Sequence, residues 1–154
     1  MTPGLRIGTS GWNYPTGRGT WNGIFYPPAR GRPKGFDELA FYASHFNTVE
    51  VNSTFYGLPR AEVCRAWAER TPAGFEFSIK LYQKFTHPSF ATDKSPVRPE
   101  DVEAFKRGIE PLATGGRLGP VLAQAGTMPP DDLKRLHAFQ AVWEIVSLEL
   151  LKDR

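Results

Sequence analysis

The sequence predicts an α/β protein in which strands and helices alternate along the chain. The segment 47–56 alternates apolar and polar side chains, so that Val49 and Val51 share one face and Glu50 and Asn52 share the other. The segments on either side of it carry apolar residues at helical spacing. Strands that alternate with helices normally form a parallel sheet buried on both faces, where a carboxylate and an amide need a partner, a ligand or water.

The remaining elements follow from the same two periodicities. Strands are expected at 5–10, 75–81 and 119–124, and helices from Asp37 to about 46, from about 59 to 70, from about 99 to 112, and from about 130 onward. In the last of these, residues 142–148 are an alternative fifth strand. The stretch 12–35 carries too many Pro and Gly residues to hold regular structure throughout.

Length and composition indicate one domain, residues 1–154, with an ordinary core. The net charge of +3 and the pI of about 9.1 are mildly basic, but no run of Lys or Arg concentrates the charge, which favours a solvated surface over a nucleic-acid interface. The sequence contains no apolar run long enough for a membrane span and no signal-peptide pattern. A single cysteine, Cys64, forms no internal disulfide, so a cytoplasmic location is expected.

Two architectures fit the alternation, a (β/α) barrel and an α+β sheet with one face in water. The absence of a glycine-rich phosphate loop after any strand removes the commonest reason for an open, doubly wound sheet. Polar residues concentrate toward the C-terminal ends of the strands, as at the mouth of a barrel. The pattern alone leaves the barrel and the α+β sheet equally supported.

Short motifs along the first 125 residues resemble a known family. Their residues are 7–12, 25–27, 46–56, 70–72 with 74–75, 77–80, 86–87, and 118–122 with Gln124. In this order they are similar to the YecE-like proteins, family seventy-two of the domains of unknown function. The resemblance is clearest over residues 5–125. It implies a TIM-like (β/α) barrel and no established reaction.

The chain departs from the family pattern after Gln124, where residues 125–130 lack the usual continuation and the next strand is not convincing. A closed barrel takes about 250 residues, so this length accommodates about four or five parallel strands with their helices. We therefore expect a partial, truncated barrel, the N-terminal half of a family member. Such a sheet has unpaired edges, and we expect self-association or pairing with a missing C-terminal half.

Three residues are the candidate catalytic groups. Glu50 and Lys80 lie near the C-terminal ends of adjacent predicted strands, and we expect their charged ends to be close enough to interact. The alternative is a structural ion pair. His87 follows the predicted strand 75–81 in a loop, where it either transfers a proton or binds a metal, or packs or caps locally.

Candidate substrate-binding residues surround these three. Asn52 and Gln124 are expected to orient a polar ligand, and Ser10 either does the same or serves a turn. Trp12, Tyr14 and Tyr56 are expected to form an aromatic wall for a base or sugar, with loop packing as the alternative. Three scattered His and one Cys make no zinc site within this chain, whereas a metal with ligands from the missing half, and the identity of any cofactor, stay open. Cys64 falls on a helix stripe and is expected in the core.

The leading hypothesis is a cytoplasmic barrel enzyme, a hydrolase or lyase, that acts on an anionic or sugar-containing small molecule at the barrel mouth. In it, Lys80 neutralises charge and Glu50 moves a proton or coordinates a metal. The competing hypothesis is a non-catalytic module that binds nucleic acid or another ligand, or an inactive remnant. Salt-dependent retention on a DNA or RNA column separates the two classes.

Overall fold

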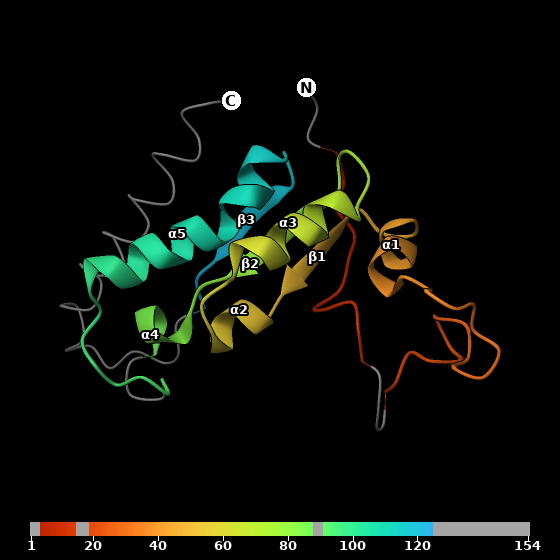
Figure 1. The fold of residues 1–154 in the computed structure, drawn as a ribbon, viewed down its shortest axis with the longest axis horizontal. Helices are drawn as coiled ribbons and strands as arrows, with labels where there is room; N and C mark the ends of the chain where they lie inside the picture. The colour runs from red at the N-terminus through yellow and green to blue at the C-terminus, as the bar shows by residue number, and fades with distance from the viewer. Residues whose placement is uncertain (1–3, 15–18, 88–90, 125–154) are drawn as a thin grey trace.

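A computed structural model describes residues 4–14, 19–87 and 91–124 (Figure 1). Helices and strands alternate over most of this range, which confirms the α/β class. In chain order the elements are α1 (Glu38–Ala43), β1 (Thr48–Val51), α2 (Ser53–Tyr56), α3 (Ala61–Glu69), β2 (Glu76–Lys80), α4 (Gln83–Thr86), α5 (Pro99–Thr114) and β3 (Leu118–Leu122).

The three strands form a parallel sheet in the order β1-β2-β3. The predicted first strand lies beside β1, because Glu50 N–H donates to Thr9 O at 3.0 Å and Gly11 N–H donates to Glu50 O at 2.9 Å. It makes an isolated parallel bridge rather than a continuous ladder. The Tyr42 hydroxyl accounts for the interruption, since it accepts from Thr9 N–H at 2.8 Å and donates to Thr48 O at 3.1 Å. The side-chain amide of Asn47 likewise accepts from Ile7 N–H and donates to Leu5 O in place of backbone groups.

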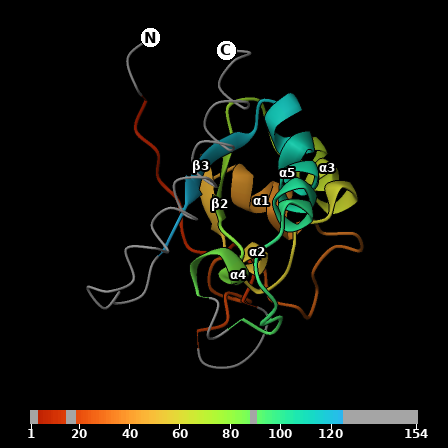
Figure 2. The same ribbon diagram turned by 90° about the vertical axis from the view of Figure 1, so that its left-hand side faces the viewer.

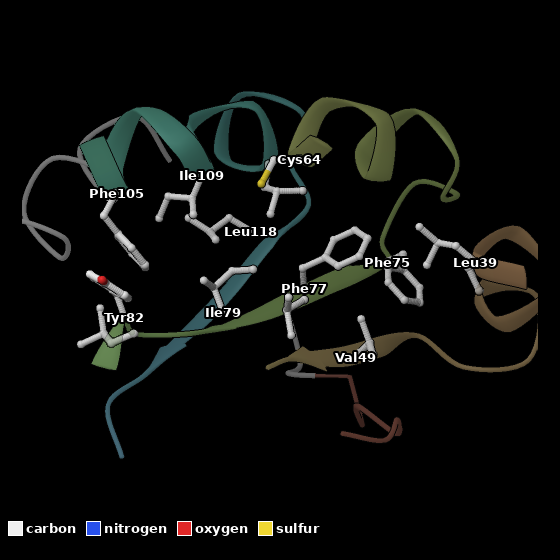
Figure 3. Close-up of a cluster of buried hydrophobic side chains, with 14 of the residues drawn as sticks. Leu39, Val49, Cys64, Phe75, Phe77, Ile79, Tyr82, Phe105, Ile109 and Leu118 are labelled. Carbon is white, nitrogen blue, oxygen red and sulfur yellow. The ribbon is translucent and has the colours of Figure 1, made fainter. Parts of the chain in front are cut away.

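One face of the sheet is apolar and is covered by α3 and α5, which lie side by side on it (Figure 2). The side chains between the two layers form an apolar core (Figure 3). Gly108 allows α5 to approach the turn before α3, because a Cβ at this position would lie 2.2 Å from Pro59 O. The buried residues of this core include Val49, Val51, Cys64, Phe77, Ile79, Ile109 and Leu118.

The other face of the sheet is polar, and its side chains are half-buried. β1 and β2 alternate strictly between buried apolar and half-buried residues, which confirms the predicted faces. The register places Glu50 beside Ser78. Arg6 forms an ion pair with Glu76 at 2.6 Å near the N-terminal ends of the strands. The expected increase in polarity toward the C-terminal ends is therefore incomplete, since this face carries charge at both ends.

The structure differs from the sequence prediction at two connections. The segment 47–56 is not one strand: β1 ends at Val51, Asn52 takes helical backbone angles, and α2 begins at Ser53. The short helix α4 was predicted as loop, because four residues are too few to show a helical period. The tail helix predicted from about 130, and its alternative strand at 142–148, lie outside the described residues.

The N-terminal loop is held together by Arg32 rather than by regular structure. The Arg32 guanidinium donates to Pro27 O at 2.7 Å and to Glu38 Oε1 at 2.7 Å, and it lies 4.9 Å from the centre of the Phe36 ring. The Trp21 ring also holds the loop together, because it packs against four other aromatic rings, those of Tyr14, Phe25, Tyr26 and Tyr42. Most aromatic side chains of the loop are therefore used in packing.

The described part of the chain contains no helix long and apolar enough to cross a membrane. Its four extended segments, 5–10 and the three strands, follow one another in space as they do in sequence. This order is the one found in a (β/α) barrel. A closed barrel has about eight parallel strands, however, and the described residues provide only four extended segments. Closure and truncation therefore stay predictions.

Candidate functional site

Four polar side chains meet at the carboxyl ends of the first extended segment, β1 and β2. The Ser10 hydroxyl donates to Glu50 Oε1 at 3.1 Å, and Asn52 Nδ2 donates to Ser10 Oγ at 2.6 Å. Lys80 Nζ lies 3.5 Å from Asn52 Oδ1, a long contact for a charged donor. Ser10, Glu50, Asn52 and Lys80 thus form a chain of contacts that runs from a carboxylate to an ammonium. We call these four residues the mouth cluster.

The backbone explains why these residues meet. Ser10 bridges to Glu50 across parallel strands, and Lys80 is the last residue of β2. Thr54 fixes the connection between them, since its hydroxyl lies 2.7 Å from Lys80 O and 3.1 Å from Val51 O. Sequence reasoning missed Thr54, although a hydroxyl residue shortly after a strand end is a common local hydrogen-bonding device.

The predicted direct contact between Glu50 and Lys80 is not formed. Among the described residues, no carboxylate lies within 4.0 Å of the Lys80 ammonium. The register explains this, because Glu50 pairs with Ser78 and Lys80 lies two residues further along β2 on the same face. Ser10 and Asn52 occupy the space between the two charges, which lie on the expected common face.

An aromatic wall borders Lys80. Its Nζ lies 5.0 Å from the centre of the Phe55 ring, within the range of a cation–π contact. The same ring contacts His87 edge to face at 5.4 Å and Tyr56 at 5.2 Å. The structure therefore brings His87 and Tyr56 to the mouth cluster through Phe55, a residue that sequence reasoning missed. Tyr56 is 71% exposed.

The other predicted substrate-binding residues lie apart from this cluster. The Trp12 ring packs edge to face against Trp67 and Phe77 on the helix-covered side, which favours the packing alternative. The Tyr14 hydroxyl donates to Ser10 O, so Tyr14 covers the turn beside the cluster without joining it. Gln124 follows β3 and is exposed, and its side chain makes no hydrogen bond to the other described residues.

No group of three or more His, Cys, Asp or Glu side chains within residues 4–14, 19–87 and 91–124 is placed to hold a metal ion. Cys64 is fully buried, and this burial raises the pKa of its thiol to about 11. A thiol that stays protonated at neutral pH is a poor nucleophile. Cys64 is therefore a core residue, as the helix stripe predicts.

A surface groove of about 570 Å³ lies elsewhere, between the C-terminal ends of α3 and α5. Two arginines, Arg65 and Arg117, and two glutamates, Glu69 and Glu110, line it. Because these helix ends adjoin the N-terminal ends of the strands, the groove is at the opposite end of the sheet from Lys80. Its balanced charges indicate no particular ligand, so the mouth cluster is the candidate site.

Comparison with known proteins identifies the family. The sequence profile described as "Protein of unknown function DUF72" matches residues 6–150. The chain is 32% identical to UPF0759 protein YunF of Bacillus subtilis over 120 residues, and 37% identical to UPF0759 protein YecE of Escherichia coli K12 over 108 residues. These alignments cover 78% and 68% of this chain, but only 39% and 37% of the two relatives.

Solved structures of the same family share the fold. A DUF72 family protein from Thermotoga maritima superposes with a TM-score of 0.61 at 27% identity, over 89% of this chain and 51% of the other. One from Enterococcus faecalis V583 superposes with a TM-score of 0.57 at 25% identity, over 69% of this chain and 43% of the other. The profile match and the curated relatives together show that this chain belongs to the DUF72 family, whose function is unknown.

Proposed function

We propose that the mouth cluster binds a small molecule that carries an anionic group and hydroxyl groups, such as a sugar phosphate or a sugar acid. The observation that supports this most directly is the Lys80 ammonium, which has only a long contact to Asn52 and the face of Phe55 as partners among the described residues. An ammonium in this situation retains donors for an anion. We further propose that the sheet is the first part of a TIM-like barrel and that the cluster lies at its mouth.

The hydrogen-bond direction along the cluster defines what a ligand must offer. Donors point from Lys80 through Asn52 and Ser10 toward the Glu50 carboxylate. A ligand is therefore recognised by an acceptor near Lys80 and by a donor, such as a sugar hydroxyl, near Glu50. The exposed Tyr56 ring beside Phe55 offers an apolar face for a sugar ring.

The proposed chemistry is proton transfer in a hydrolase or a lyase. In hydrolysis, Glu50 accepts a proton from the attacking water and His87 gives a proton to the leaving oxygen, while Lys80 stabilises the negative charge of the substrate. In elimination, Glu50 takes the proton from carbon and His87 again protonates the leaving group. Both schemes use one carboxylate, one imidazole and one ammonium.

Isothermal titration calorimetry with glucose 6-phosphate, gluconate, inorganic phosphate and glucose tests the binding proposal. Lys80→Met is expected to weaken binding of the anionic probes about tenfold or more, because it removes a charge-assisted hydrogen bond. Glu50→Gln is expected to act mainly on the probes with hydroxyls. Lys94→Met is the control, because Lys94 is an exposed lysine outside the cluster. Equal binding by the Lys80 and Lys94 variants would contradict the proposal.

A non-catalytic nucleic-acid-binding module is the second candidate. The basic pI and the exposed side chains of Tyr14 and Tyr56 favour it, since bases stack on exposed aromatic rings. Retention on a single-stranded DNA or RNA column that falls steeply with salt, together with no binding of the small anions, would support this candidate over the enzyme.

A further inference from the structure

Lys84 is a buried lysine that sequence reasoning did not single out. It lies in α4, and its side chain is 1% exposed. Its ammonium donates to Asp93 Oδ2 at 2.8 Å, to Asp101 Oδ2 at 2.8 Å and to Ser95 Oγ at 3.0 Å. Three donors thus meet three acceptors, so the charge is fully satisfied.

The three acceptors come from two different segments. Asp93 and Ser95 belong to the loop before α5, and Asp93 Oδ1 also accepts from Ser95 N–H at 2.9 Å. Asp101 lies in the first turn of α5, and its Oδ2 accepts from Arg98 N–H at 2.9 Å. The Lys84 ammonium therefore joins α4, the loop 91–98 and the start of α5. It does so with two carboxylates and a hydroxyl, whose accepting oxygens are of the kind that surround a bound cation.

The segment that Lys84 fixes also carries the candidate site. α4 begins three residues after Lys80 and ends immediately before His87. His87 N–H donates to Gln83 O, and Ala91 N–H donates to His87 O at 3.0 Å. The His87 ring contacts Phe55, which lies against Lys80. Displacement of α4 would therefore separate His87 from the mouth cluster.

We infer that Lys84 is a positioning residue: its ammonium acts as a built-in cation that holds α4 in place and keeps the His87 imidazole against Phe55 beside Lys80. The significance of this position rests on the function proposed above, whereas the placement itself does not. A buried charge with its counter-ions is seldom more stabilising than apolar side chains of the same volume. The cluster is thus better explained by the geometry that it enforces than by the stability that it adds.

Lys84→Ala with added n-propylammonium tests the inference. The substitution removes three methylenes and the ammonium, which n-propylammonium replaces. The readouts, taken without any ligand, are the nuclear Overhauser effect between the Phe55 and His87 rings and the chemical shift of the His87 ring protons. We expect Lys84→Ala to abolish the Overhauser effect and n-propylammonium to restore it, whereas n-propanol, which lacks the charge, does not. Lys94 is an exposed lysine in the loop 91–98, between Asp93 and Ser95, and Lys94→Ala is expected to change neither readout.

Asp93→Asn is the milder variant if Lys84→Ala does not fold, because it removes one of the two carboxylates and leaves Asp101 to cap α5. It is expected to shift the His87 ring resonances while the melting temperature changes little. Two results would overturn the inference. One is an Overhauser effect between the Phe55 and His87 rings that persists in folded Lys84→Ala or, if only Asp93→Asn folds, His87 ring resonances that do not shift in that variant. The other is an Overhauser effect that weakens only in proportion to global unfolding.

A separate arm uses glucose 6-phosphate as the probe. If the wild-type chain binds no probe but Lys84→Ala still separates the Phe55 and His87 rings, the proposed function fails and the positioning role stands. If the wild type binds the probe and Lys84→Ala binds it equally with the two rings still in contact, the positioning role fails alone.

Discussion

Lys80, at the end of β2, and Lys84, in α4, are four residues apart in sequence and have opposite environments. Lys84 is enclosed by two carboxylates and a hydroxyl, whereas Lys80 is half-buried and has only an amide oxygen at 3.5 Å and an aromatic face among the described residues. A satisfied buried charge fixes structure, and an incompletely satisfied accessible charge is available to a ligand. This difference is the residue-level basis for assigning one lysine to the site and the other to its support.

Lys80→Ala is expected to cost under about 1 kcal/mol of unfolding free energy, because no ion pair is broken and no carboxylate is left buried without a partner. Denaturant titration of the variant and the wild type measures the difference. A loss of about 3–5 kcal/mol would show that Lys80 neutralises a buried charge and would remove the argument for an available ammonium.

Asp37 predicts how the stability responds to acid. It caps α1 through Ala40 N–H, and the Arg70 guanidinium beside it lowers the pKa of its carboxyl. A carboxyl whose pKa is lower in the folded state contributes stability above its ordinary pKa of about 3.9, and the contribution is lost as the pH falls through the folded value. Asp37→Asn keeps the cap and removes the charge.

Melting temperatures of the wild type and Asp37→Asn should therefore differ at pH 6 and converge as the pH falls below about 4. The carboxylates around Lys84, whose pKa values are also lowered, contribute equally to both proteins and cancel in the comparison. If the difference in melting temperature stayed constant across this pH range, the charge of Asp37 would not contribute to stability, which would contradict the prediction.

At the level of elements, the packing of α5 beside α3 depends on the close approach of Gly108 to Pro59. Gly108→Ala would place a methyl group 2.2 Å from Pro59 O, a clash that is relieved only if α5 and the turn before α3 move apart. We expect a cost of about 1–3 kcal/mol. Gly57→Ala is the matched control, since it has extended backbone angles and no atom within 4 Å of the added methyl. Chemical denaturation of both variants checks this, and equal stabilities would contradict the packing described for α5.

Periodicity predicted the elements that are long or strictly alternating. The alternation of Val49 and Val51 with Glu50 identified β1 and its polar face, and three of the predicted helices appear as α1, α3 and α5. It did not predict that the strand ends at Val51, because the end depends on hydrogen bonds from Thr54 to two carbonyls far apart in sequence. Periodicity correctly placed Glu50 and Lys80 on one face of the sheet. It did not predict the distance between them, because that distance depends on the register of β1 and β2. Trp12 was assigned to the site because sequence alone does not show on which side of the sheet a ring packs.

At the scale of the whole molecule, the described sheet has open edges. The N–H groups of Arg6 and Gly8 make no backbone hydrogen bond to other described residues, and Leu5 and Ile7 beside them are 78% and 55% exposed. Unpaired edges with apolar side chains promote strand addition. Among the described residues, the edge at residues 5–10 is therefore where a strand of another chain can pair through backbone hydrogen bonds, which a helix surface does not offer.

We therefore expect the purified chain to be dimeric or prone to aggregation, with the edge at residues 5–10 involved. Arg6→Pro removes an outward-facing N–H, whereas Arg6→Ala keeps it and removes the same side chain. Sedimentation velocity should show less association for Arg6→Pro than for Arg6→Ala. A compact wild-type monomer with a sharp, reversible unfolding transition would contradict the expectation.

Binding of an anionic, hydroxyl-bearing molecule at the mouth cluster is detected residue by residue by amide chemical-shift mapping. Glucose 6-phosphate is titrated into the ¹⁵N-labelled chain. We expect saturable shifts at the amides of Ser10, Asn52 and Lys80 that disappear in Lys80→Met. No shifts at these residues, or shifts confined to the groove near Arg65 and Arg117, would contradict it.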